Sequence, residues 1–374
     1  MAIILSPRVL RRGLEFSLLA SLVGFAAVLF YRGNYRDFLG SLRHLEPIWL
    51  LVGLGVSSMD WIGGGLRHWV ISRHVWPATA LKSMIIAGGM GAWAGYLTPV
   101  HAGASPMMVY TMRRYGVPIP VGFTTILMSF ITTVIFFAVA GPLAVFLGAG
   151  RSLGEKGALL GLSLYDLFVG SLAVFGGLGV LMLLLILFPG VARDLIHRLA
   201  ERLGRRSEKM AAKLEHFRAG IDEAHASLVS FLCFRGLVAL LIGVVLTGLA
   251  YAPRLFSGYV VLRAIGIEAH FIDVLLLQTL ITFLLYFAPT PGASGIGEIL
   301  SALVMQVYVP KELVALYALL WRLFVTYLTV ITGSVVFYGW VRRGLRHLET
   351  EPADAGVENP ASASAGRPTV GAGV

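Results

Sequence analysis

The residues whose types and spacing best suit ligand binding lie in the segment TPGASGIGE, at 290–298. Its glycines, Gly292, Gly295 and Gly297, resemble the turn of a dinucleotide site, where backbone N–H groups at a helix start hold phosphate. That turn needs the spacing Gly-x-Gly-x-x-Gly after a β-strand, whereas this segment has Gly-x-x-Gly-x-Gly after an apolar run at 270–288. The segment therefore indicates a helix broken inside a membrane, with N–H groups that face either a lipid phosphate or a neighbouring helix.

Four ionisable side chains fall within apolar runs: Asp60, Arg235, Glu298 and Arg322. Each costs roughly 2.5–3.5 kcal/mol on insertion scales, so each needs a partner or a task. Glu298 falls in the first turn of a short helix, with Ser294 as the expected N-cap, where the helix dipole favours a carboxylate. Its alternatives are to pair with Arg322 or to take a proton-coupled or headgroup-contacting role. Arg322 is expected either to pair with Glu298 or to bind a lipid phosphate bidentately. Asp60 and Arg235 are candidates to pair with each other across helices.

The composition identifies the class of protein that must position these residues. Of 374 residues, 57% are hydrophobic and 13% are charged, whereas soluble domains carry about 25% charged residues. We therefore expect a polytopic membrane protein. Cys233 is the single cysteine, which excludes an intramolecular disulfide. We find no nucleophile–base order, no metal-ligand spacing and no carboxylate cluster, so we expect no enzyme activity, metal or cofactor.

The predicted fold is all-α, a polytopic membrane helix bundle with two inverted re-entrant helical hairpins. The membrane domain spans 1–348 with a cytoplasmic loop at 190–226, and an Ala-, Gly-, Pro- and Ser-rich tail at 349–374 is expected to be disordered. The segment at 251–267 is expected to be either interfacial or a kinked extension of the helix before it. The predicted apolar helices lie at 14–31, 47–66, 83–97, 120–147, 162–188, 228–250, 270–288 and 313–340.

The distribution of Lys and Arg predicts the orientation. With a cytoplasmic N-terminus and two re-entrant segments, the inner loops carry 19 basic residues and the outer loops carry 8. We therefore expect a multi-pass protein of the cell inner membrane with both termini cytoplasmic. The net charge of +10 then forms mostly a cytoplasmic collar facing anionic headgroups, and we expect no nucleic-acid partner.

Two segments resemble each other and predict an internal repeat. LTPVHAGASPMMVYTMRRYGVP at 97–118 and FAPTPGASGIGEILSALVMQVYVP at 287–310 share the order proline, Gly-Ala-Ser, short helix and Val-Pro. The short helix at 104–114 would be about 16 Å long, too short for a core of about 30 Å. Broken helices at matching positions of two inverted halves are typical of transport sites near the membrane midplane.

These segments resemble the flippase-like integral membrane family that includes the lysylphosphatidylglycerol synthase transmembrane region. The second segment is similar to its Pro-x-Pro-Gly-Gly-x-Gly-x-x-Glu signature, with Ala293 in place of the second glycine, and Arg322 matches a later arginine of the family. In the first segment the residues that match a related pattern are Thr98, Pro99, Gly103, Pro106, Tyr110 and Arg114. The resemblance implies translocation of lipids or lipid-linked sugars. Family members that carry a lipid-modifying domain place it after the membrane region. Since this sequence continues only briefly after its last predicted helix, we expect no such domain here.

The candidate substrate-binding residues come from both segments. His101 is either a group that titrates near neutral pH or a hydrogen-bonded structural histidine. The full set is Pro99, His101, Gly103, Pro289, Pro291, Gly292, Gly295, Gly297, Glu298 and Arg322.

We expect a flippase-like protein that binds and translocates a lipid or lipid-linked substrate across the bacterial inner membrane. The expected partner is an anionic, aminoacylated, isoprenoid or glycosylated lipid. The alternative is a non-transporting accessory protein for a lipid-synthesis or glycosyltransferase enzyme, with the loop at 190–226 as its docking surface.

Overall fold

The computed structural model describes residues 7–32, 42–146, 229–286 and 288–350, with Gly40 and short or isolated pieces between 158 and 226. Over these residues the regular structure is helical apart from a two-residue antiparallel pair, β1 (Ala158–Leu159) and β2 (Leu162–Ser163), and short turns and loops connect the helices. The predicted all-α class is therefore confirmed. Most of the predicted helix at 162–188, nearly all of the loop at 190–226 and the tail beyond Thr350 lie outside the described residues.

Five helical stretches of the described chain are long and apolar enough to cross a membrane. Their exposed faces are rich in Leu, Ile, Val and Phe, the side chains that a lipid environment accepts. The stretches are α1 (Pro7–Arg32), α3 (Pro47–Val75), α6 (Ile119–Phe146), α10 (Phe234–Ala250) with α11 (Ala252–Ala264), and α14 (Val314–Arg322) with η4 (Leu323–Tyr327) and the first part of α15 (Leu328–Thr350).

The joint between α10 and α11 lies at Tyr251, which caps the end of the first helix and the start of the second. Pro253 follows in the first turn of α11, where its missing N–H costs no helical hydrogen bond. The segment at 251–267 therefore forms a kinked extension, which confirms one of the two predicted alternatives. The kink carries Arg254 into the bundle.

Both predicted breaks are present as an apolar helix, a 3-10 turn and a short helix. The first break, residues 97–103, contains η2 (Pro99–His101), and the second break, residues 288–295, contains η3 (Pro291–Ala293). The two turns pack against each other although nearly 200 positions separate them in the chain. The flanking helices are α4 (Leu81–Tyr96) and α5 (Ala104–Arg114), and α12 (Phe271–Tyr286) and α13 (Ile296–Met305).

The breaks use left-handed backbone at residues other than glycine. Val100 and His101 have φ of 52° and 54°, and Ala293 has φ of 55° beside Gly292 at 57°. A non-glycine residue in this region costs of order 1–3 kcal/mol and persists only where the surrounding structure holds it. Such strain is common at binding sites, so the point where the two breaks meet is a candidate site.

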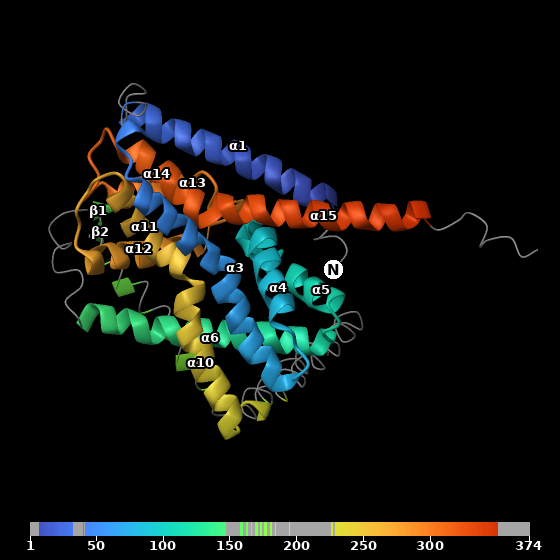
Figure 1. Cartoon of the computed structure of the whole chain (residues 1–374). Helices are drawn as coiled ribbons and strands as arrows, with labels where there is room; N and C mark the ends of the chain where they lie inside the picture. Colours follow the sequence, from blue (N-terminus) through green and yellow to red (C-terminus); the bar gives the residue numbers. More distant parts are fainter. Residues whose placement is uncertain are drawn as a thin grey trace, which may run out of the picture. The chain divides into compact units, whose positions relative to one another are not determined.

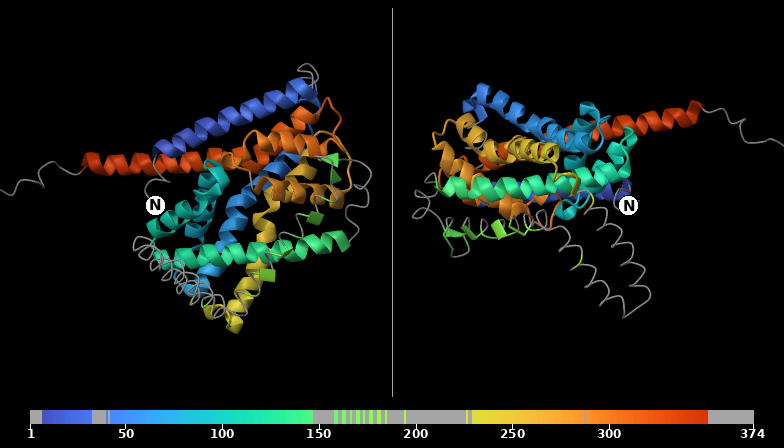
Figure 2. Two further views of the ribbon diagram at one scale, coloured as in Figure 1. Left: turned by 180° about the vertical axis from the view of Figure 1, so that it is seen from behind. Right: turned by 90° about the horizontal axis from the view of Figure 1, so that it is seen from below.

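The packing places α3 at the centre of the helices around the first break. It contacts α4 on one side and α10 and α11 on the other (Figure 1). Two further views show α6 running past α3, α5 and α10 (Figure 2). A hydrophobic cluster that includes Leu277, Leu316 and Trp321 packs α11, α12, α13 and α14 together. The chain divides into two compact units after Ile331, and the site described below lies within the first.

Candidate functional site

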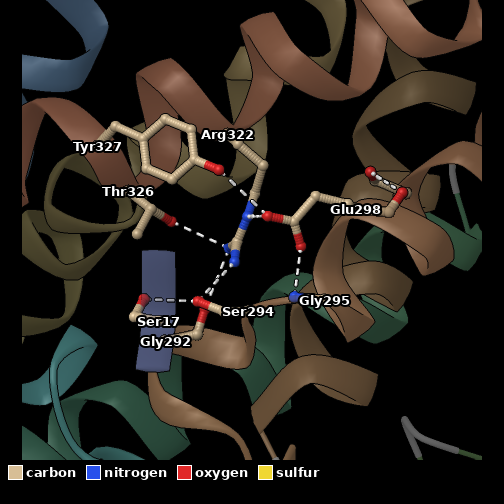
Figure 3. A network of polar contacts seen from close by, with 9 residues as sticks. Ser17, Gly292, Ser294, Gly295, Glu298, Arg322, Thr326 and Tyr327 are labelled. Atoms are coloured by element: carbon tan, nitrogen blue, oxygen red, sulfur yellow. Dashed lines mark hydrogen bonds and ion pairs between the residues drawn. The ribbon is translucent and has the colours of Figure 1, made fainter. Parts of the chain in front are cut away.

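Arg322 and Glu298 form a buried ion pair at the second break. Their side chains are 2% and 1% exposed, and Arg322 Nε donates to Glu298 Oε1 at 2.8 Å (Figure 3). Arg322 Nη1 also donates to the Gly292 carbonyl at 3.0 Å and to Thr326 Oγ1 at 3.1 Å. Its Nη2 donates to Ser294 Oγ at 3.4 Å. Each guanidinium nitrogen thus has a protein partner, and the pairing with Glu298 expected from the sequence is formed.

Glu298 also closes the start of α13. Its Oε2 accepts from the Gly295 N–H at 2.8 Å, and its Oε1 accepts from the Tyr327 hydroxyl at 3.2 Å. The N-cap of α13 is Gly295, which corrects the expected N-cap Ser294 by one residue. The N–H of Gly295 is engaged within the chain because Glu298 folds back onto it. In this conformation the Gly295 N–H is therefore not available to a lipid phosphate, which was one of the two partners expected from the sequence.

Two local features allow this close packing. The helix widens to a π-helical turn directly after Arg322, at Leu323–Tyr327, and this turn supplies Thr326 and Tyr327. A Cβ atom on Gly297 would lie 3.2 Å from Arg322 Cζ, so glycine gives the guanidinium room. Gly297, predicted as a site residue, thus acts by having no side chain.

Helix α1 lies against both breaks. Ser17 Oγ and Ser294 Oγ share a hydrogen bond at 2.6 Å, and a Cβ on Gly24 would lie 2.7 Å from Gly295 Cα. A Cβ on Gly13 would overlap the Leu97 carbonyl of the first break. The sequence analysis missed this role of α1. The available signal was the run of small residues spaced three or four apart: Gly13, Ser17, Ser21 and Gly24.

The first break is tied by Thr98 rather than by a charge. Thr98 Oγ1 accepts from the Gly103 N–H at 2.8 Å and donates to the Ala94 carbonyl at 2.8 Å. His101 is half-buried and makes an edge contact with the Tyr96 ring, their centroids 5.8 Å apart. Pro99 is exposed, as is Pro289 of the second break, so neither is held by the core.

A second polar cluster surrounds Asp60. Tyr96 donates to Asp60 Oδ2 at 3.3 Å and Thr329 donates to the same oxygen at 2.9 Å. Arg254 Nη1 lies 3.7 Å from Asp60 Oδ1, and Arg254 Nη2 donates to the Tyr96 hydroxyl at 2.7 Å. The ionic partner of Asp60 is therefore Arg254. This corrects the suggested pairing with Arg235, which is exposed at the start of α10.

A cavity of about 160 Å³ joins the two clusters. Arg254 and Arg322 both line it, together with His101 of the first break and Gly292 and Ala293 of the second. Typical ligand pockets measure about 300–1,000 Å³, so this cavity suits a headgroup rather than a whole lipid. The remaining lining residues are Tyr96, Tyr251, Thr282, Leu285, Trp321, Val325 and Thr326.

The predicted site residues thus fall into four groups. Gly295, Gly297 and Glu298 build the network around Arg322, and His101, Gly292 and Arg322 line one cavity. Gly103 and Pro291 are buried within the breaks. Pro99 and Pro289 are exposed, and Arg235 lies apart from both clusters. Among the cavity residues that the sequence did not predict, Arg254 carries a charge; its segment could equally have been interfacial.

Gly292→Ala should destabilise the contact between the breaks. The residue has φ of 57°, and its Cβ would lie 2.8 Å from the Tyr96 carbonyl oxygen. Gly266 is a matched control, because its φ is 75° and a Cβ there meets no atom within 4 Å. Both alanines incur the left-handed penalty of about 1–2 kcal/mol, and Gly292→Ala adds about 1–3 kcal/mol of overpacking. Equal shifts of the unfolding midpoint in the two variants would contradict this contact.

The membrane-length helices, the apolar exposed faces and the buried ionic clusters define a multi-pass membrane protein. Residues 14–333 match the family described as the lysylphosphatidylglycerol synthase TM region, and the chain belongs to this family. The resemblance noted in the sequence is thereby confirmed. A UPF0104 membrane protein of Archaeoglobus fulgidus is 24% identical over 297 residues, which cover 79% of this chain and 87% of that relative. No solved structure matches the chain.

Proposed function

We propose that the chain binds a lipid or lipid-linked substrate by its headgroup where the two breaks meet, and translocates it across the inner membrane. The observation that carries this proposal is the cavity lined by Arg254, Arg322 and residues of both breaks. Membership of a membrane-protein family named after a lipid synthase supports a lipid as the substrate.

The proposal includes the inverted re-entrant arrangement expected from the sequence. Helices broken at matching positions of two halves place irregular backbone beside a substrate site. Backbone of this kind is tolerated at membrane depth only where protein or a wet cavity satisfies it. The contact between η2 and η3 and the adjoining cavity support this part of the proposal.

The two arginines would have different tasks. Arg322 has a buried carboxylate at 2.8 Å and further partners on its other nitrogens, so it holds the second break together. Arg254 lies 3.7 Å from Asp60 and its side chain is 22% exposed. Because the Arg254 side chain is more exposed than that of Arg322, at 22% against 2%, a headgroup phosphate can reach Arg254 more readily. In this scheme both termini are cytoplasmic, and translocation proceeds without a covalent step on the lipid.

Reconstitution into liposomes tests the proposal. Fluorescent lipids of four classes (anionic, aminoacylated, isoprenoid-linked and glycosylated) are placed in the inner leaflet, and their exposure to an outside quencher is followed. We expect accelerated exposure for at least one class. Arg254→Met should slow the translocation of that lipid class at least about tenfold, equivalent to ~1.4 kcal/mol of lost interaction.

The matched control is Arg263→Met in the same helix, because Arg263 pairs with the exposed Glu268 at 3.1 Å. This variant should translocate at the native rate. Absence of acceleration for all four classes would contradict translocation and favour the accessory role.

A further inference from the structure

A second cavity, of about 250 Å³, lies among α3, α4, α5, α6, α10 and α11. Arg67 and His68 of α3, Ser129 and Thr133 of α6, and Arg254 of α11 line it. It extends from the Asp60 cluster away from the second break, and neither Arg322 nor Glu298 contributes to its wall. The proposed function assigns no task to Arg67, His68 or Ser129.

Three buried polar atoms of these lining residues have no hydrogen-bond partner among the described residues: Arg67 Nε, His68 Nδ1 and Ser129 Oγ. His68 is only 7% exposed and Ser129 only 4%. More than about 90% of buried polar groups in proteins have a partner. Three such atoms around one cavity make its wall rich in polar groups that a polar occupant can complete.

The charges around the cavity favour an anion. Arg67 Nη1 donates to Thr133 Oγ1 at 2.8 Å and to Thr247 Oγ1 at 3.4 Å, and Arg67 forms no ion pair with a described carboxylate. Asp60 is the one carboxylate of the lining, and it lies beside Arg254. Two guanidinium groups therefore face a single carboxylate, and the excess charge is positive.

Gly64 shows that the wall of this cavity is open. The residue is buried, yet a Cβ built on it would meet no heavy atom within 4 Å. Buried helical glycines elsewhere in α3 are tightly packed; a Cβ on Gly63 would lie 2.8 Å from the Leu249 carbonyl carbon. A side chain introduced at position 64 would therefore enter the cavity rather than strike the backbone.

We propose that this cavity binds a phosphate group, carried by a lipid headgroup or present as free phosphate, through Arg67, His68, Ser129 and Arg254. The donors come from three helices, which suits the several oxygens of a tetrahedral anion, and a guanidinium can hold two of those oxygens at once. The cavity is smaller than a typical ligand pocket of about 300–1,000 Å³, so acyl chains would remain outside. As a headgroup site it rests on the proposed function and names the substrate chemistry.

Binding to the purified full-length chain in detergent tests the proposal by calorimetric titration with three probes. The probes are dioctanoyl phosphatidic acid, dioctanoylglycerol, which has the same chains without phosphate, and inorganic phosphate. We expect phosphatidic acid to bind at least tenfold more tightly than dioctanoylglycerol. Displacement by inorganic phosphate at similar concentrations assigns the site to free phosphate, and binding of the lipid alone assigns it to a headgroup.

Two variants and two controls locate the binding. Arg67→Met and Gly64→Leu should each weaken phosphate binding at least tenfold, the first by removing charge and the second by filling space. Arg263→Met controls for loss of an arginine. Gly55→Leu controls for a leucine in α3, because Gly55 is exposed and a Cβ there meets no atom within 4 Å. Both controls should remain within twofold of the native affinity, and unfolding midpoints without ligand identify any variant that misfolds.

Equal affinity for the two lipids, or native affinity in folded Arg67→Met and Gly64→Leu proteins, would overturn the phosphate site. Translocation is measured separately in liposomes. Binding as expected without lipid movement would refute the proposed function and leave the phosphate site standing. Lipid movement with native phosphate affinity in both variants would refute the site and leave the function standing.

Discussion

Glu298→Gln and Arg322→Met should each lower the free energy of unfolding by about 3–5 kcal/mol, the range measured when one partner of a buried ion pair is removed. The pair is at most 2% exposed, so the remaining charge would have no water to solvate it. The glutamine amide has one accepting oxygen in place of two, so it cannot accept from both the Gly295 N–H and Arg322 Nε. Reversible unfolding in mixed micelles, followed by circular dichroism, measures the change.

The control is the pair Arg263–Glu268, whose N–O distance is 3.1 Å but whose Glu268 side chain is 88% exposed. Glu268→Gln should change stability by less than about 1 kcal/mol, because water and salt screen a surface pair. The double variant Glu298→Gln/Arg322→Met should lose less than the sum of the single losses, with a coupling of about 0.5–3 kcal/mol. If Glu298→Gln, Arg322→Met and the double variant all unfold like the native chain, the segment at 290–298 is only a packing turn.

A disulfide between α1 and the second break should slow translocation. Ser17 Oγ and Ser294 Oγ lie 2.6 Å apart in a hydrogen bond, so cysteines at these two positions would bring their sulfur atoms together. We expect a Ser17→Cys/Ser294→Cys protein, built in a Cys233→Ser background, to crosslink on oxidation. Translocation by moving hairpins requires the second break to shift against its neighbours. The oxidised protein should therefore translocate at least about tenfold more slowly than the same protein after reduction.

The reduced double-cysteine protein supplies the baseline, and each single-cysteine variant shows the effect of oxidant alone. Cys233 is the chain's one native cysteine, so its replacement removes competing disulfides. An unchanged rate in fully crosslinked protein would show that the substrate passes without movement between α1 and the second break.

Much of the described fold could be predicted because a membrane imposes simple rules. Long apolar runs gave α1, α3, α6 and α10, and proline with glycine located both breaks. The pairing of Glu298 with Arg322 followed from the cost of a lone charge in an apolar helix. The same cost left a lipid phosphate as the other expected partner of Arg322, and it also suggested the pair Asp60–Arg235, which the structure replaces with Asp60–Arg254.

The remaining features depend on tertiary packing, which hydropathy does not encode. Asp60 pairs with Arg254 because the kink at Tyr251 turns α11 into the bundle. No local signal selected Arg254 over Arg235. Val100 and Ala293 adopt left-handed backbone although their residue types disfavour it, because neighbouring segments hold the turns in place.

The role of α1 illustrates the same limit. Its sequence identifies an apolar membrane helix, and its small residues indicate a face for close packing. The partner of that face is not encoded locally, because Gly24 and Gly295 lie far apart in the chain and meet only in the fold. Contacts of this kind join the two breaks into one site.

The most direct test of the account is the rate at which a fluorescent lipid in the inner leaflet becomes accessible to an outside quencher in liposomes containing the purified chain. Empty liposomes and liposomes with heat-denatured protein give the background. The account predicts quenching that extends to the inner leaflet for at least one lipid class, at a rate that rises with protein per vesicle and falls at least about tenfold in Arg254→Met. Background rates for every lipid class in liposomes that contain folded protein would contradict it.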